Sequence, residues 1–162
     1  MADAEELSAE VFLDGQIPAD EEWTLVDALA VLGVRTHAKV VPARRGLGEL
    51  HWLVLVSLPL QAFLTSVGSR LAEDAYQGFQ RAVGRLLGRA QGQPAAEQPR
   101  PMVLQDTASG LQVVLEADLP DAAYQQLVAM DLAKFHLGPL HYDRQQRRWR
   151  SELDEARARP AT

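Results

Sequence analysis

Three short segments of this chain share one local plan, in which a β-prone stretch runs through Ile-Pro or Leu-Pro into a helix-forming stretch. Proline holds φ near the helical value and lacks the N–H group that the first turn of a helix leaves unpaired. It also pushes the residue before it into an extended conformation. Each pair therefore predicts the point at which a strand ends and a helix begins. The three pairs are Ile17-Pro18, Leu58-Pro59 and Leu119-Pro120.

The segments around these points predict the element order β-α-β-β-α-β-β-α-β, with helices over residues 20–32, 60–88 and 121–136. Residues 50–58 are almost all apolar, which is typical of a strand that is covered on both faces near the centre of a sheet. The first six elements have the order of a ferredoxin-like sandwich, in which helices pack on one face of an antiparallel sheet. We therefore expect an α+β fold. It would be a ferredoxin-like or related two-layer sandwich, with a mainly antiparallel sheet and about three helices.

The helix expected over residues 20–32 carries acidic residues in its first turn, where the positive end of the helix dipole favours them. Its apolar residues predict the side that faces the core. To that side we assign Trp23, Val26 and Ala30, together with the group Leu29, Val31 and Leu32.

A length of 162 residues fits a single domain, residues 1–162. Hydrophobic residues make up 47% and charged residues 23% of the chain, which is close to the globular average and excludes a disordered chain. Residues 89–101 are rich in Gly, Pro and Gln and predict a flexible internal linker. We expect residues 152–162 to form a helical or disordered tail.

The chain begins with an acidic stretch that has neither the basic nor the apolar region of a signal peptide. Residues 50–68 are uncharged over nearly the length that spans a bilayer, but Pro59 divides them and polar residues dilute them. We therefore expect a soluble protein without a membrane segment. The absence of cysteine removes disulfides, thiolate metal sites and a cysteine nucleophile, and fits a reducing, cytoplasmic location.

The residue types that carry catalysis show no recognisable spacing in this chain. The four histidines lack metal-ligand spacing, no serine lies in a nucleophile elbow, and no glycine-rich segment is a complete phosphate loop. The sequence favours a non-catalytic role, with no cofactor and no metal. An enzyme would instead require His37, His141 or the Arg44-Arg45 loop to converge in one cleft, whereas His51 is expected to be a buried structural histidine.

The helix expected over residues 60–88 carries one continuous apolar stripe and would be roughly 40 Å long at 1.5 Å per residue. This length exceeds what a small domain needs, so we expect its far end to stay partly exposed as a docking stripe. The stripe consists of Phe79, Val83, Leu86 and Leu87. It predicts a protein-interaction or adaptor module that binds a protein partner or another copy of itself. A small-ligand-binding regulatory domain is the first alternative, because ferredoxin-like layers can hold ligands over a sheet or between subunits.

Residues 144–159 are rich in arginine, and two local structures compete for their first half. A hairpin with residues 144–147 as its loop would pair Asp143 with Arg148, Tyr142 with Trp149 and His141 with Arg150. A helix would instead use Asp143 as its N-cap. We favour the hairpin, followed by a short helix.

The arginines of this segment could contact an anion, and nucleic-acid binding through them is the second alternative function. The candidate anion contacts are Arg144, Arg147, Arg148 and Arg150. Four acidic residues lie in the same segment, and blocks of opposite charge alternate along a chain of net charge −6. A nucleic-acid surface needs cations that are not neutralised within the chain. We therefore expect a self-neutralised face and no nucleic-acid partner.

Overall fold

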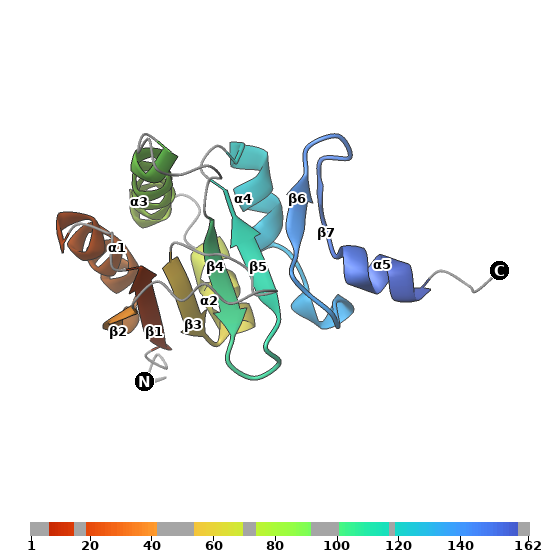
Figure 1. Ribbon diagram of the computed structural model, residues 1–162, viewed down its shortest axis with the longest axis horizontal. Helices are drawn as coiled ribbons and strands as arrows, with labels where there is room; N and C mark the ends of the chain where they lie inside the picture. Colours follow the sequence, from red (N-terminus) through yellow and green to blue (C-terminus); the bar gives the residue numbers. More distant parts are fainter. Residues whose placement is uncertain are drawn as a thin grey trace.

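The computed structural model describes residues 7–14, 19–41, 54–69, 74–91, 101–116 and 119–158. The fold is α+β, with one five-stranded sheet, a separate two-stranded hairpin and helices α1–α5 (Figure 1). The elements in chain order are β1 (Leu7–Asp14), α1 (Ala19–Val31), β2 (Val34–Val41), β3 (Val54–Leu58), α2 (Leu60–Gly68), α3 (Asp74–Gln91), β4 (Met102–Asp106), β5 (Gln112–Leu115), α4 (Asp121–Val128), the 3-10 turn η1 (Leu132–Lys134), β6 (His141–Asp143), β7 (Arg148–Arg150) and α5 (Glu152–Ala158).

The strand order of the main sheet is β2-β1-β3-β4-β5. The pairs β1–β2 and β3–β4 are parallel, whereas β1–β3 and β4–β5 are antiparallel. The expected ferredoxin-like detail is therefore not matched. In that fold the βαβ unit is split, but here α1 connects two strands that are direct neighbours. The expected α+β class is confirmed, but the structure has helices α1–α5 where about three were expected. The sequence did not predict which strands are neighbours, because strand order depends on long-range packing.

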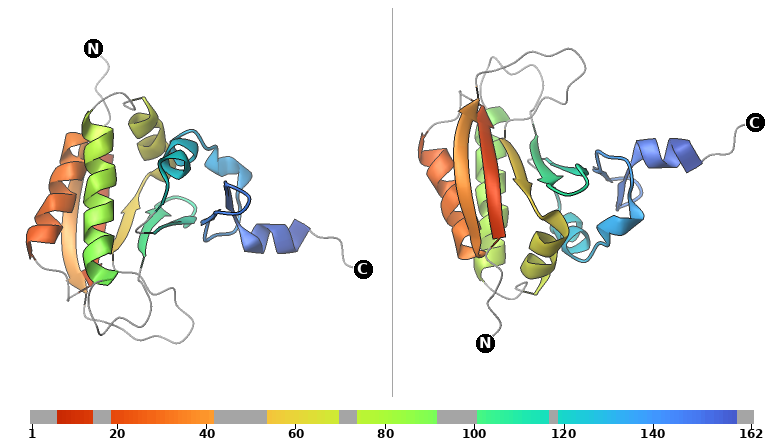
Figure 2. Two further views of the ribbon diagram at one scale, coloured as in Figure 1. Left: turned by 90° about the horizontal axis from the view of Figure 1, so that it is seen from above. Right: turned by 90° about the horizontal axis from the view of Figure 1, so that it is seen from below.

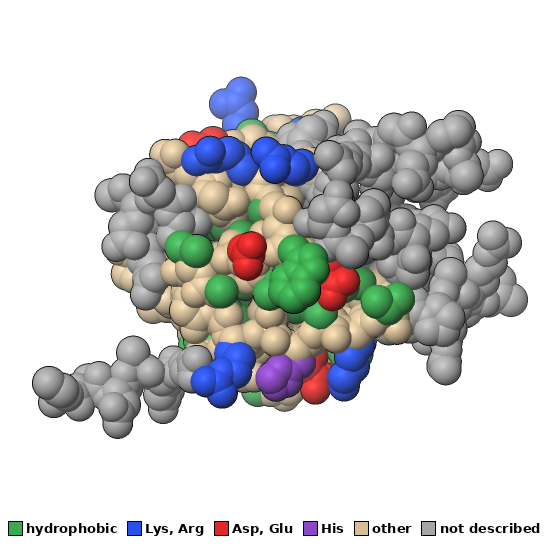
Figure 3. All heavy atoms as spheres, turned by 90° about the vertical axis from the view of Figure 1, so that its left-hand side faces the viewer, with side chains coloured by type: hydrophobic (Ala, Val, Ile, Leu, Met, Phe, Trp, Pro, Cys, Tyr) green, Lys and Arg blue, Asp and Glu red, His purple; other side chains and the backbone are tan. Residues whose placement is uncertain are grey.

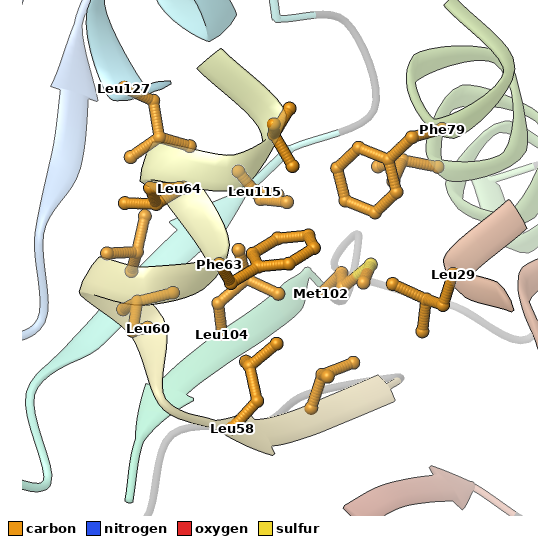
Figure 4. Close-up of a cluster of buried hydrophobic side chains, with 14 of the residues drawn as sticks. Leu29, Leu58, Leu60, Phe63, Leu64, Phe79, Met102, Leu104, Leu115 and Leu127 are labelled. Carbon is orange, nitrogen blue, oxygen red and sulfur yellow. The ribbon is translucent and has the colours of Figure 1, made fainter. Parts of the chain in front are cut away.

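The core lies between one face of the sheet and helices α1–α4 (Figure 2). Alternate residues of β3, namely Val54, Val56 and Leu58, are buried toward this core, while Leu55 and Ser57 on the other face are only partly buried. A strand directs successive side chains to opposite faces, so this pattern fixes which face the helices cover. In Figure 4 the buried side chains of α2 meet those of α1, α3, α4 and the central strands.

The start of a helix directly after proline is confirmed at two of the three proline boundaries, although β5 ends at Leu115, before Leu119-Pro120. Pro59 lies between the end of β3 and the start of α2, and Pro120 directly precedes α4. The pair Ile17-Pro18 lies outside the described residues. Pro59 also divides the uncharged segment into β3 and α2, and in the described ranges no helix is both long and apolar enough to cross a membrane.

Asp106 at the end of β4 accepts a hydrogen bond from the first residue of α2, where the N-cap residue Pro59 has no side chain that could do so. Its carboxylate accepts from the backbone N–H of Leu60 at 3.1 Å and from the backbone and hydroxyl of Ser109 at 3.0 and 2.7 Å. Partial burial raises the pKa of Asp106, but the hydrogen bonds from Ser109 and Leu60 outweigh burial and hold it below its ordinary value. Gly110, with φ of +76°, closes the same turn.

The single long helix expected over residues 60–88 is wrong, because α2 ends at Gly68 and α3 begins at Asp74. Gly68 lies close to the backbone of α4, since an added Cβ would stand 3.1 Å from the carbonyl oxygen of Val128. The hydroxyl of Ser69 donates to the carbonyl of Ser66 at 2.7 Å and so competes with helix continuation. The break lets α2 and α3 pack on the sheet as two separate helices.

The favoured structure of the arginine-rich end is confirmed. β6 and β7 pair in the expected register, with His141 opposite Arg150, Tyr142 opposite Trp149 and Asp143 opposite Arg148. The rings of Tyr142 and Trp149 are 5.6 Å apart, and the indole Nε1 of Trp149 donates to the carbonyl of Ala123 in α4 at 2.9 Å. The short helix α5 follows, as expected.

Two further boundaries differ from expectation. The helix expected over residues 121–136 ends at Val128 and is followed by η1. The buried side of this shorter helix consists of Ala123, Tyr124 and Leu127. Of the linker expected over residues 89–101, the first part continues α3 to Gln91, and residues 92–100 lie outside the described ranges.

Candidate interaction surface

The docking stripe expected on the long helix is not exposed. Phe79, Val83 and Leu87 are 4%, 0% and 2% exposed and belong to the core, and the side chain of Leu86 lies outside the described residues. The physical reason is the break after α2, which lays α3 against the sheet instead of projecting it beyond the domain. Helix α3 therefore offers no exposed apolar stripe among its described side chains.

Three of the four candidate anion-binding arginines contact carboxylates of this chain. The guanidinium of Arg150 lies between Asp143, at 2.7 Å, and Glu155. Hydrogen bonds with Glu155 and with Asp143 raise the pKa of Arg150 above its ordinary value. Arg148 also reaches Glu155, at 3.5 Å.

The remaining two arginines lie at the ends of the hairpin loop. Arg144 is 3.4 Å from Glu116, and Arg147, with φ of 55°, is exposed and has no carboxylate partner among the described residues. A surface on which most cations are paired in this way offers little uncompensated charge to a nucleic acid.

The histidines proposed for an enzyme do not converge. His37 lies on β2 at one edge of the sheet, whereas His141 lies on β6, at the opposite end of the molecule (Figure 1). Residues Arg44, Arg45 and His51 lie outside the described residues. Within the described ranges, no group of three or more His, Cys, Asp or Glu residues could hold a metal ion.

A depression of about 380 Å³ lies between the end of α2 and the segment that follows α4. Its polar groups already bind one another: the side-chain amide of Gln61 donates to the carbonyl of Met130 at 3.3 Å and accepts from the N–H of Leu132 at 2.8 Å. The carboxylate of Asp131 accepts from the N–H of Ala133 at 3.0 Å. These contacts explain the polar residues there by local structure, so the depression does not support the small-ligand alternative.

Helix α1 carries apolar side chains on the side opposite the core. Leu25, Leu29 and Leu32 follow the i, i+4, i+7 spacing of one helix face, and all three are buried. Trp23 and Ala30 are also seven positions apart and share the opposite face. The side chain of Trp23 is 64% exposed. The assignment of Trp23 and Ala30 to the core side is therefore wrong.

Val31, also assigned to the core side, is 61% exposed. Among the apolar residues of α1, the three leucines pack in the core, whereas Trp23, Ala30 and Val31 are exposed. The signal in the sequence was the regular leucine spacing, which leaves Trp23, Ala30 and Val31 without a place in the core.

Strand β2 forms an uncovered edge next to α1. Within the described ranges, β2 pairs only with β1, and Ala38 and Val40 on its α1-facing side are exposed, Val40 by 63%. The opposite edge of the sheet is different. There Leu140 donates to the carbonyl of Gln112 at 2.8 Å and accepts from the N–H of Val114 at 3.0 Å, which caps the outer edge of β5.

The other face of β2 carries cationic and titratable side chains. Arg35, His37 and Lys39 alternate along the strand and are all exposed. On the neighbouring strand β1, Glu10 lies 3.9 Å from Lys39, and the ring of Phe12 lies 5.8 Å below its ammonium group. Figure 3 shows hydrophobic and acidic side chains on the face of α1 and β2, with a row of charged and histidine side chains along its border.

We name the whole area the α1–β2 surface. It comprises Trp23, Ala30, Val31, Ala38 and Val40, with Arg35, His37 and Lys39 along one side. No protein-family model, no curated protein and no solved structure matches this chain.

Proposed function

We propose that this chain is a non-catalytic protein-interaction module that binds its partner through the α1–β2 surface. The observation that carries the proposal is the exposure of Trp23 and Val31 on α1, beside a strand edge that pairs with nothing among the described residues. Scattered exposed hydrophobic residues are normal on a protein surface, but tryptophan is enriched among the residues that dominate binding sites.

Tryptophan is one of the side chains that contribute most to binding at such sites. Aromatic side chains bury about 150–250 Å² each, and burial of apolar area contributes about 25 cal/mol per Å². Covering the exposed part of Trp23 would thus contribute about 3 kcal/mol before the cost of ordering both partners. Residues of this type dominate measured binding energies, and the surrounding smaller side chains exclude water. Ala30 and Ala38 fit that second role.

The rest of the described structure supports the same choice of surface. The core buries Phe79, Val83 and Leu87. Arg150 forms an ion pair with Asp143, and the backbone of Leu140 pairs with the outer edge of β5. Among the described residues, the α1–β2 surface combines exposed apolar side chains with a strand edge that has no paired neighbour.

Site-specific photocrosslinking in the cells that make the protein tests the proposal. A photoreactive phenylalanine analogue at Ala30, which is exposed on the same side as Trp23, should give a discrete adduct of defined mass. The same analogue at Leu153, which is 54% exposed on α5, serves as the matched control. We expect the Ala30 adduct to disappear when Val31→Glu is added. Equal adducts from both positions, or none from Ala30, would contradict the proposal.

A further inference from the structure

We infer that the partner binds as an extended segment added beside β2, with acidic side chains next to Arg35, His37 and Lys39 and apolar side chains next to α1. This inference rests on the proposed function and names the class of partner for the same surface. It has three independent supports: the backbone of β2, its charge pattern and the apolar side chains beside it.

The backbone of β2 offers a long pairing edge. The strand has eight residues, Val34–Val41, all in register with β1 on its inner side. A strand at the edge of a sheet presents a row of unpaired N–H and C=O groups on its outer side. Proteins usually protect such edges by shortening, bulging or covering them, and Leu140 covers the opposite edge of this sheet. Addition of a peptide strand is an established use of an edge that is left open.

The charges on β2 indicate which kind of peptide strand would pair with it. Side chains of residues directly opposite each other in paired strands lie on the same face, so an added strand places every second residue next to the row of Arg35, His37 and Lys39. Opposite charges in such pairs stabilise the sheet, and like charges destabilise it. Lys39 already lies 3.9 Å from Glu10 of β1, but both side chains of that pair are more than half exposed and an exposed ion pair is weak, so a carboxylate directly opposite on the added strand can compete for the ammonium group. The row on β2 therefore favours glutamate or aspartate at alternate positions of the partner.

The same pattern argues against a second copy of β2 as the occupant. Antiparallel pairing of two β2 strands around a two-fold axis centred on His37 places Arg35 of each copy opposite Lys39 of the other. Shifting the register by two residues still sets members of this row against one another. A hetero-partner with acidic residues avoids this conflict.

The apolar side of the added strand would contact α1. Ala38 and Val40 are in register with Val11 and Leu13, whose side chains face the helix layer. A strand beside β2 would direct its other residues to the same side, next to the exposed apolar residues of α1. The partner segment therefore alternates acidic and apolar residues.

The inference is tested with the full chain and a synthetic peptide of about nine residues that alternates glutamate and valine. Three control peptides have the same length: a scrambled order, a lysine–valine alternation, and a version with N-methylated amides at every second residue. Affinity is measured by fluorescence anisotropy, and backbone amide exchange of residues 34–41 is measured by NMR. We expect the glutamate–valine peptide to bind at least about tenfold more tightly than the lysine–valine peptide and to slow exchange in β2.

A pair of charge variants makes the test specific. The double substitution His37→Glu with Lys39→Glu should reverse the preference toward the lysine–valine peptide. Lys134→Glu, an exposed substitution on η1, should leave the preference unchanged. N-methylation of the peptide on the side that pairs with β2 should abolish the slowing of exchange.

Four results would overturn the inference: no peptide that slows exchange in β2, equal binding of all peptides, self-association through β2, or binding of a single-stranded oligonucleotide in place of the peptides. The Ala30 crosslink separates this failure from that of the proposed function. An adduct that persists while β2 exchange stays unchanged removes strand addition but leaves the interaction surface, whereas loss of the adduct removes both.

Discussion

The ring of Phe63 on α2 meets the ring of Phe79 on α3 edge to face, with centroids 5.8 Å apart and planes at 76° (Figure 4). These residues are sixteen positions apart, and in one continuous helix they would lie about 24 Å apart along the axis. The contact therefore exists only because the helix breaks after Gly68. The contact packs α3 against the core, so Phe79, which was expected in the exposed docking stripe, is buried instead.

Phe79→Ala should lower the free energy of unfolding by about 3–5 kcal/mol, because it removes a buried ring and leaves a cavity beside Phe63. Leu153→Ala on α5 should change it by less than about 0.5 kcal/mol, since that side chain is 54% exposed. Urea denaturation of both variants measures the two values. Similar effects at the two positions would contradict the placement of α3.

The same substitution at two tryptophans should have different effects on the stability of the fold. Trp149→Phe removes the hydrogen bond to the carbonyl of Ala123 and should destabilise the fold by about 1–3 kcal/mol. Trp23→Phe should leave stability within about 0.5 kcal/mol, because Trp23 is mostly exposed. Thermal unfolding followed by circular dichroism distinguishes the two. A strong loss of stability from Trp23→Phe would show that Trp23 belongs to the fold.

Asp143→Asn should reduce stability at neutral pH and lose its effect in acid. Hydrogen bonds from the N–H of Gln146 and from Arg150 hold the pKa of Asp143 below its ordinary value of 3.8. The folded state therefore favours the ionised form, so this stabilisation is present above pH 3.8 and is lost as the pH falls through the lowered folded-state pKa.

Urea denaturation between pH 7 and pH 2 should accordingly show the difference between the wild-type chain and Asp143→Asn shrinking below about pH 4. The destabilisation caused by Trp149→Phe has no titrating group behind it and should stay constant over the same range. A difference for Asp143→Asn that persisted at pH 2 would rule out the ion pair with Arg150 as its cause.

Two glycines should respond to alanine in opposite directions. At Gly84, in the interior of α3, an added Cβ meets nothing within 4 Å, so Gly84→Ala should stabilise the protein by about 1 kcal/mol through helix propensity. At Gly138 an added Cβ would stand 3.1 and 3.2 Å from the backbone nitrogen and oxygen of Gln112, which cannot move aside, so Gly138→Ala should destabilise it. Melting temperatures of the two variants give the sign directly, and equal signs would contradict the packing of residue 138 on β5.

Local chemistry made several features of the fold predictable from the sequence. Pro59 and Pro120 mark where helices begin, and Pro59 also marks where a strand ends, because proline restricts its own backbone and that of the preceding residue. The hairpin register that pairs Tyr142 with Trp149 follows from alternation and from opposite charges at the neighbouring pair. These signals depend on interactions between residues that are close in the sequence.

Features that depend on distant contacts were not predictable in the same way. The apolar stripe through Phe79 has the same periodicity whether the helix is continuous or broken, so the sequence could not locate the turn near Gly68. Strand order is likewise set by packing across the whole sheet. On α1, Trp23 looked like a core residue because hydrophobicity alone does not distinguish a buried face from one that a partner covers.

The most direct test of the account is the yield of the photocrosslinked adduct from Ala30, compared between the chain with Trp23 intact and Trp23→Ala, in the cells that make the protein. The account predicts that Trp23→Ala reduces the yield at least tenfold while the chain stays folded by circular dichroism. An adduct of unchanged yield, or one formed equally from Leu153, would contradict the claim that α1 and the edge of β2 form the binding surface.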